Sequence, residues 1–294
     1  DFRFNLAQAS TPELVGKLGD ANGWVRDTAQ RLLIARNDAA IAPALAQAAV
    51  AQGQPPAARL HALWTLEGKD AISRATIVNA LRDQDARVAA AAVRLAEKFF
   101  TQQGGDPELA ARVASLVQTR TEPEVRLQLA FTLGEIRTPG ADEALRALVI
   151  AAGKQPYLAD AVVSGLAGRE LAFVTALVRD EKAAAQAEDA VRYAFSAVIK
   201  SGDVPQIERG LALLTANDTQ AWARSALIVG VRQALPRSPD GRALAGSLPI
   251  EPKPLIALAA QSDADGKAAQ QLLTQIRWPG KAGVVATVVR PLSV

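Results

Sequence analysis

The chain has 294 residues, of which 49% are hydrophobic and only 4% are aromatic. Its 33 basic and 30 acidic side chains leave a net charge of +3 with no run of like charges, which argues against a nucleic-acid-binding protein. Cysteine is absent, so these residues contain no disulfide, no thiolate metal site and no attachment site for c-type haem.

The first predicted pair of helices lies near the N-terminus. Ser10 or Thr11 can cap a helix in which Pro12 takes an early position, and an apolar stripe extends to Leu18. A polar turn over 20–23 follows. The second helix is expected to begin at about Trp24 and to end near residue 37, because its apolar residues recur at helical spacing.

The sequence pattern of this second helix recurs along the chain with some residues replaced. It reads NGWVRDTAQRLL, then AARLHALWTLEG, DARVAAAAVRLAEKF and EPEVRLQLAFTLGEI. If Val25 is the reference, the equivalent positions follow at intervals of 33, 30, 37 and 33 residues, and they are Ala58, Val88, Val125 and Leu158. Paired helices with repeats of this length bury their apolar faces by stacking on copies of themselves.

Three further pairs are expected after residue 170. They cover 171–178 with 187–200, 205–214 with 220–235, and 253–261 with 266–276. We therefore predict an all-α chain, a right-handed α-solenoid of about seven or eight helical pairs. It forms one continuous domain over 1–277.

Two segments depart from the helical pattern. The stretch 236–254 contains five prolines and is expected to be a loop-rich break with little regular structure. The segment 278–294 begins WPGK and continues GVVATVV, which indicates an irregular or β-prone exit linker. Glycines at 68 and 168 are expected to end second helices in the left-handed conformation.

An arginine follows the reference position in three repeats, as Arg26, Arg59 and Arg126. The polar residues Asn22, Asp85 and Glu122 stand three positions before it. In a stack of helical pairs, these guanidinium groups can bond the turn of the adjacent pair and form a structural seam. The alternative is a ridge that binds an anion or a partner.

His61 is the single histidine, and no cysteine can complete a metal site with it. We therefore expect a structural residue that is hydrogen-bonded to a neighbouring turn. Paired acids occur at 83 and 85, 122 and 124, 142 and 143, and 188 and 189, where turn and capping roles account for them. The sequence predicts no catalytic, cofactor-binding or metal-ligating residue.

The tryptophans are expected to have structural or interface roles. Trp24 and Trp64 occupy periodic positions on second helices, which predicts packing between repeats. Trp278 stands beside Pro279 and Gly280, where it can anchor the exit segment to the last helices or meet a partner.

Units of the V-R-x-x-A type resemble HEAT repeats of the armadillo-type fold. NGWVRDTAQRLL, ARLHALWTLEG, AVRLAE and EVRLQLAFTLGE are similar to the HEAT-like region of large membrane-bound dehydrogenase-type proteins of planctomycetes and related bacteria. The resemblance is closest over 5–170 and implies a β-propeller before the helical region and a c-type cytochrome with a CxxCH site after it. The matching positions are structural, and no haem ligand or cofactor residue carries over.

This resemblance implies a non-catalytic scaffold or protein-interaction module with neighbouring propeller and cytochrome c domains or subunits as partners, in a periplasmic or extracytoplasmic compartment. A stand-alone HEAT-repeat adaptor is one alternative. The other is a module that lends residues such as Arg59 to an oxidoreductase active site.

The chain opens at Asp1 and has no signal-like segment, so we expect that it was processed or excised from a longer protein. No apolar stretch reaches the roughly 18 residues that a membrane-spanning helix needs. We therefore expect no membrane span.

Overall fold

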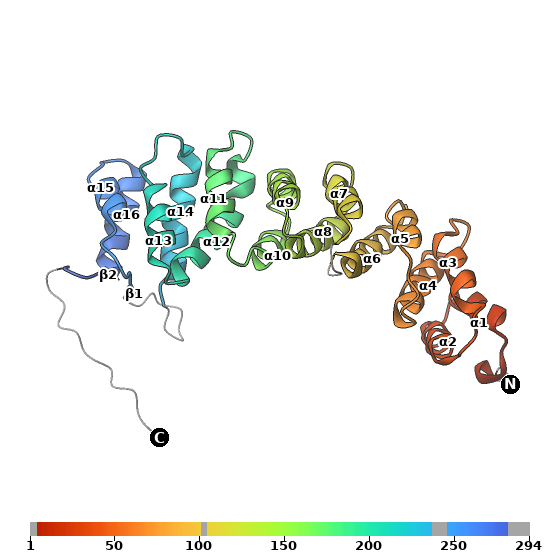
Figure 1. Ribbon diagram of the computed structural model, residues 1–294. Coiled ribbons are helices and arrows are strands. Elements are labelled where there is room, and N and C mark those ends of the chain that lie inside the picture. Colours follow the sequence, from red (N-terminus) through yellow and green to blue (C-terminus); the bar gives the residue numbers. More distant parts are fainter. Residues whose placement is uncertain (1–4, 101–104, 237–245, 282–294) are drawn as a thin grey trace, which may run out of the picture. The chain divides into compact units, whose positions relative to one another are not determined.

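The computed structural model describes residues 5–100, 105–236 and 246–281, and this part of the chain is mostly helical (Figure 1). It contains sixteen α-helices, a few short 3-10 turns and two strands of two residues each. The prediction of an all-α chain is therefore confirmed. None of the described helices is both long and apolar enough to cross a bilayer.

The chain divides into two compact units, residues 1–148 and 149–294, and the boundary falls within α9 (Pro139–Ala152). Unit 1 holds eight further α-helices. They are α1 (Thr11–Lys17), α2 (Gly23–Ala35), α3 (Ile41–Val50), α4 (Pro56–Gly68), α5 (Arg74–Ala80), α6 (Ala86–Ala96), α7 (Pro107–Ser115) and α8 (Pro123–Glu135).

Helices of unit 1 contact each other in a regular order. Consecutive helices pack as pairs, α1 with α2, α3 with α4, α5 with α6 and α7 with α8. The second helix of each pair also contacts the second helix of the next, from α2 through α4 and α6 to α8 (Figure 1). We call α2, α4, α6 and α8 the second helices of unit 1.

Polar caps start several of these helices where the sequence predicted them. The Ser10 hydroxyl accepts from the backbone N–H of Glu13, whose carboxylate in turn accepts from Ser10, so the two form a capping box at α1. Asn22 caps α2 and Asp85 caps α6 through their side-chain oxygens. The expected capping role is confirmed at Ser10 and Asp85, whereas Glu122, before α8, makes no side-chain cap hydrogen bond.

Alanine lets α6 pack closely on both sides. Its buried residues lie all round the helix, and only Arg87 and Arg94 are exposed. Such a helix needs neighbours on both faces, which α4 and α8 provide. Small side chains at this place allow close approach of the flanking second helices.

Unit 2 holds seven further helices and the two strands. They are α10 (Leu158–Ser164), α11 (Glu170–Arg179), α12 (Glu188–Lys200), α13 (Val204–Ala212), α14 (Ala221–Ala234), β1 (Gly246–Ser247), α15 (Lys253–Ala259), α16 (Ala264–Gln275) and β2 (Ile276–Arg277). The six helices predicted after residue 170 are confirmed to within a few residues. Of the expected pairs, α11 packs on α12 and α15 on α16, whereas α13 contacts α11, α12 and α15 more than α14. Contacts run from α10 through α12 and α14 to α16.

The predicted break at 236–254 contains one short strand among its described residues. Gly246 and Ser247 pair in parallel with Ile276 and Arg277, and the N–H of Leu248 extends the ladder to the carbonyl of Arg277 at 2.9 Å. The helix α15 begins at Lys253, where the sequence predicted a helix over 253–261, and Pro254 suits its first turn. Residues 237–245 and the apolar run of the predicted exit linker lie outside the described residues.

One of the two glycine predictions is confirmed. Gly168 is left-handed, with a φ of 81°. Gly68 instead ends α4, and the left-handed residue is Asp70, with a φ of 54°. A Cβ on Gly68 would lie 2.8 Å from Cδ1 of Ile34 on the neighbouring second helix, so this glycine serves close packing.

Phe195 on α12 is fully buried in unit 2 and depends on two glycines. A Cβ on Gly230 of α14 would lie 2.9 Å from the carbonyl oxygen of Arg192 and 3.2 Å from Cβ of Phe195. A Cβ on Gly210 of α13 would lie 2.7 Å from the Phe195 ring. The two glycines therefore make room for the ring between three helices.

We expect Gly230→Ala to lower the free energy of unfolding by about 1–3 kcal/mol, because the added methyl would press on the backbone of α12. Gly16→Ala in α1 is the matched control, since nothing lies within 4 Å of that position. The control should be neutral or stabilise by up to about 1 kcal/mol through helix propensity. Thermal denaturation of both variants tests this, and equal effects would contradict it.

Candidate functional site

The guanidinium of Arg59 and the carboxylate of Asp83 form a buried ion pair between two helical pairs of unit 1. Arg59 lies on α4 and is 4% exposed, whereas Asp83 lies in the turn before α6 and is 1% exposed. Nε of Arg59 donates to Oδ2 of Asp83 at 2.7 Å, and Nη2 donates to Oδ1 at 2.8 Å. The predicted seam, in which a guanidinium bonds the turn of the adjacent pair, is present here.

Asp83 connects several segments of unit 1. Its carboxylate also accepts from the backbone N–H of Asp85 at 2.8 Å and from the side chain of Gln52 at 3.3 Å. Its carbonyl accepts from Nη1 of Arg120 at 2.9 Å. Burial raises the pKa of Asp83, but the hydrogen bonds from Arg59 and Asp85 outweigh this and keep the pKa below its ordinary value.

Arg26 and His61 form a second polar contact between second helices. Nε of Arg26 donates to Nε2 of His61 at 3.3 Å, and Nδ1 of His61 lies 2.7 Å from Oε1 of Gln30. This pattern assigns the proton of the imidazole to Nδ1. His61 is thus hydrogen-bonded to side chains of the neighbouring helix α2 instead of a turn. Arg26 also bonds the turn of its own pair, through the carbonyls of Asp20 and Ala21.

Arg126 departs from the predicted seam. Its Nε is buried, and no described residue accepts a hydrogen bond from it. Arg120, six residues earlier in the turn before α8, makes the connection to the preceding pair through Asp83. The spacing of the repeat marked Arg126 and carried no signal for Arg120.

The expectation that Trp24 and Trp64 pack between repeats is wrong. Trp24 is 65% exposed and Trp64 is 36% exposed. Trp24 lies in the first turn of α2, away from the buried Ala29 and Leu33. Trp64 lies one turn before the exposed Glu67 on α4, whereas the buried stripe of that helix includes Leu63 and Leu66. Helical period places both indole rings on the solvent side.

Trp64 belongs to a row of exposed side chains on unit 1. The same position, six residues after the reference, is exposed on each of the four second helices, and its occupants are Arg31, Trp64, Arg94 and Phe131. These helices contact each other in succession, so equivalent positions follow one another across them. We call these four residues the exposed row. Phe131, 46% exposed, was not identified from the sequence, although the repeat spacing marks it.

A shallow pocket of about 260 Å³ opens in the exposed row between α4 and α6. Trp64 and Glu67 lie on one side, with Arg94 and Leu95 on the other. An ion pair between Lys98 and Asp70 crosses it at one end. The pocket therefore combines an aromatic ring, a guanidinium and acidic groups at the surface.

Trp278 has an intramolecular partner. Nζ of Lys281 lies 4.4 Å from the centre of the Trp278 ring and donates to the carbonyls of Leu273 at 2.6 Å and Ile276 at 2.7 Å. The lysine therefore closes the C-terminal end of α16 and holds the ring by a cation–π contact. This favours the predicted anchoring role. No group of three potential metal ligands occurs among the residues that the structure describes.

Comparison with known proteins adds no relative from which a role could be taken. A scan against models of protein families finds no match to this chain, and a search of curated proteins finds none either.

We expect Arg59→Ala to lower the free energy of unfolding by about 3–5 kcal/mol, because it leaves the Asp83 carboxylate buried without its cation. Arg87→Ala is the control, since Arg87 pairs with Asp85 but its side chain is 68% exposed. That change should cost at most about 1 kcal/mol. Denaturant unfolding measures both, and a loss below about 1 kcal/mol for Arg59→Ala would contradict the buried role.

Partial burial and the nearby Arg26 guanidinium lower the pKa of His61, although Asp27 opposes this. A lowered pKa in the folded state means that the unfolded chain takes up the proton more readily. Stability is therefore complete above the unfolded pKa of about 6.5 and falls as the pH drops below it.

We expect the free energy of unfolding to decrease from pH 7.5 to pH 5.5 in the unmodified protein. His61→Gln should lose this slope, because an amide does not titrate in the interval. Denaturant unfolding at a series of pH values checks the expectation, and the same slope in both proteins would rule out His61 as its origin.

Proposed function

We propose that this chain is a right-handed α-solenoid of HEAT-like helical pairs that acts as a non-catalytic scaffold or protein-interaction module. The observation that carries the proposal is the exposed row. Aromatic and arginine side chains are enriched in protein interfaces, and they dominate the binding energy where they are anchored centrally. Here they recur at one position of helices whose other faces are buried against each other.

The contacts between successive helical pairs support the stacked arrangement. Each second helix of unit 1 packs on the next, and polar groups connect neighbouring pairs at Arg26 with His61 and at Arg59 with Asp83. In a repeat stack, each unit is stabilised by its neighbours, and the repeated face becomes an extended binding surface. The second helices supply that face in this proposal.

We further propose that the partners are neighbouring domains or subunits of a larger extracytoplasmic protein, a β-propeller and a c-type cytochrome. This part of the proposal depends on the resemblance of the repeated units to the HEAT-like region of that family. A stand-alone adaptor with the same binding face is the alternative. Sequence upstream and downstream of the chain distinguishes them, because a propeller pattern and a CxxCH motif favour the multidomain protein.

The third possibility, that Arg59 or His61 lends atoms to an oxidoreductase active site, has no observation in its favour. Each of the three guanidinium nitrogens of Arg59 already donates, two to Asp83 and Nη1 to the carbonyl of Gln54. Both ring nitrogens of His61 are likewise engaged. A substrate at either residue would have to displace these bonds.

Site-specific photo-cross-linking in the native host tests the proposed face. A benzophenone amino acid at Phe131 on α8 should cross-link to a haem-staining or propeller-containing polypeptide, identified by mass spectrometry. The matched control is the exposed Ala111 on α7, the first helix of the same pair. Equal cross-linking from both positions, or from Ala111 alone, would contradict the use of the second-helix face. A single unrelated partner at Phe131 would favour the adaptor.

A further inference from the structure

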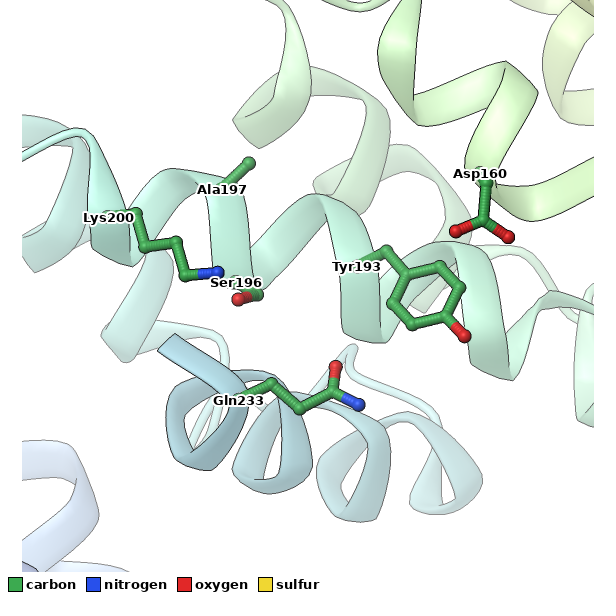
Figure 2. Close-up of a pocket in the computed structure, with 6 residues that line it drawn as sticks. All are labelled: Asp160, Tyr193, Ser196, Ala197, Lys200 and Gln233. Carbon is green, nitrogen blue, oxygen red and sulfur yellow. The ribbon is translucent and has the colours of Figure 1, made fainter. Parts of the chain in front are cut away.

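A polar pocket of about 500 Å³ lies in unit 2 on the helices α10, α12 and α14 (Figure 2). Its volume falls in the range of small-ligand sites. Six residues from the three helices line it: Asp160, Tyr193, Ser196, Ala197, Lys200 and Gln233. None of them was singled out by the sequence, because no repeated motif contains them.

Ser196 is the feature of this pocket that its surroundings do not explain. The residue is 6% exposed and lies in the interior of α12, yet its hydroxyl makes no hydrogen bond to any residue that the structure describes. Other helical serines of this unit satisfy their hydroxyl groups locally, as Ser164 does through the carbonyl of Ala161 at 2.8 Å. The Ser196 hydroxyl is therefore available inside the pocket.

Lys200 adds a positive charge without a partner carboxylate. It forms no ion pair within the described part of the chain, in contrast to Lys154, which bridges Glu188 at 3.2 Å and Asp189 at 3.3 Å. Figure 2 shows its side chain directed back along α12 toward Ser196. An ammonium and a hydroxyl thus face the same end of the pocket.

Neutral donors and an acid occupy the rest of the pocket. The Gln233 amide points from α14 toward the pocket, and Tyr193 extends toward the end where Asp160 lies on α10 (Figure 2). The Tyr193 hydroxyl accepts from Arg192 at 3.1 Å, which leaves its own proton free to donate. Asp160 forms no ion pair within the described part of the chain, so an acceptor stands opposite the Lys200 end.

We propose that this pocket binds a zwitterionic ligand of the size of a short peptide. Its carboxylate pairs with Lys200 and Ser196, its amide groups bond Tyr193 and Gln233, and its cationic end pairs with Asp160. The pocket volume of about 500 Å³ accommodates a ligand of this size. Charge-assisted hydrogen bonds at both ends then set the orientation of the ligand.

NMR titration of the whole chain with triglycine tests the proposal. We expect amide shifts concentrated in α10, α12 and α14, with saturation in the millimolar range. Lys200→Gln and Ser196→Ala should each weaken binding, the former by about tenfold. Lys182→Ala is the matched control, because Lys182 is an exposed lysine of the same unit outside the pocket and should bind like the unmodified protein.

Two further probes separate the charge requirement and the source of the ligand. N-acetyl-triglycinamide lacks both charges and should fail to bind. An end-blocked peptide with a glutamate and a lysine three residues apart should bind more tightly than triglycine if the natural ligand is a segment of a protein, and more weakly if it is a free peptide.

Binding of triglycine that is unchanged in Lys200→Gln, or shifts spread over both units, would overturn the assignment. Absence of amide shifts with triglycine would overturn it as well. If Lys200→Gln then lowers the thermal stability, the role of Lys200 is to compensate the dipole at the C-terminal end of α12. The readout is independent of the proposed scaffold role, since unit 1 is not involved.

Discussion

Helices as short as those of this chain gain their stability from packing on neighbours. In water, isolated helices shorter than about 12 to 15 residues are marginal, and both α1 and α5 have only seven residues. The packing of each second helix on the next supplies the missing stabilisation in unit 1. Alanine on α6 and the glycine at the end of α4 allow the short interhelical distances that this packing needs.

Polar groups within this packing tolerate little change, since each has a specific partner. The Asp83 carboxylate is buried at a cost in solvation, which the bidentate Arg59 and the N–H of Asp85 offset. The same residue receives Arg120 through its carbonyl, so one turn connects the helical pairs on both sides. Such contacts fix the relative position of neighbouring pairs more specifically than apolar packing alone.

The consequence for function is a division between inward and outward positions of the second helices. Inward positions carry mostly alanine, valine and leucine, whereas one recurrent outward position carries arginine, tryptophan, arginine and phenylalanine. Trp64 and Phe131 are 36% and 46% exposed, and the recurrence of large exposed side chains at this position is the observation on which the proposed interaction surface rests. Unit 2 offers a different surface, a polar pocket lined by Lys200 and Ser196.

The sequence by itself determined the helices, because the period of apolar residues, the prolines at helix starts and the capping residues are local signals. It also marked Arg59 and His61 as structural, and it located the pairs after residue 170 to within a few residues. The sequence did not predict the strand pairing of Gly246 with Ile276, because the two segments lie about 30 residues apart and are too short to show a pattern.

Only the tertiary structure decided which side of each helix meets a neighbour. The repeat predicted packing for Trp24 and Trp64, whereas their exposure follows from where the adjacent helices lie. The same holds for the choice of Arg120 over Arg126 at Asp83 and for the grouping of Ser196, Lys200 and Gln233. Such groupings depend on distances between helices, which side-chain packing sets and local sequence does not encode.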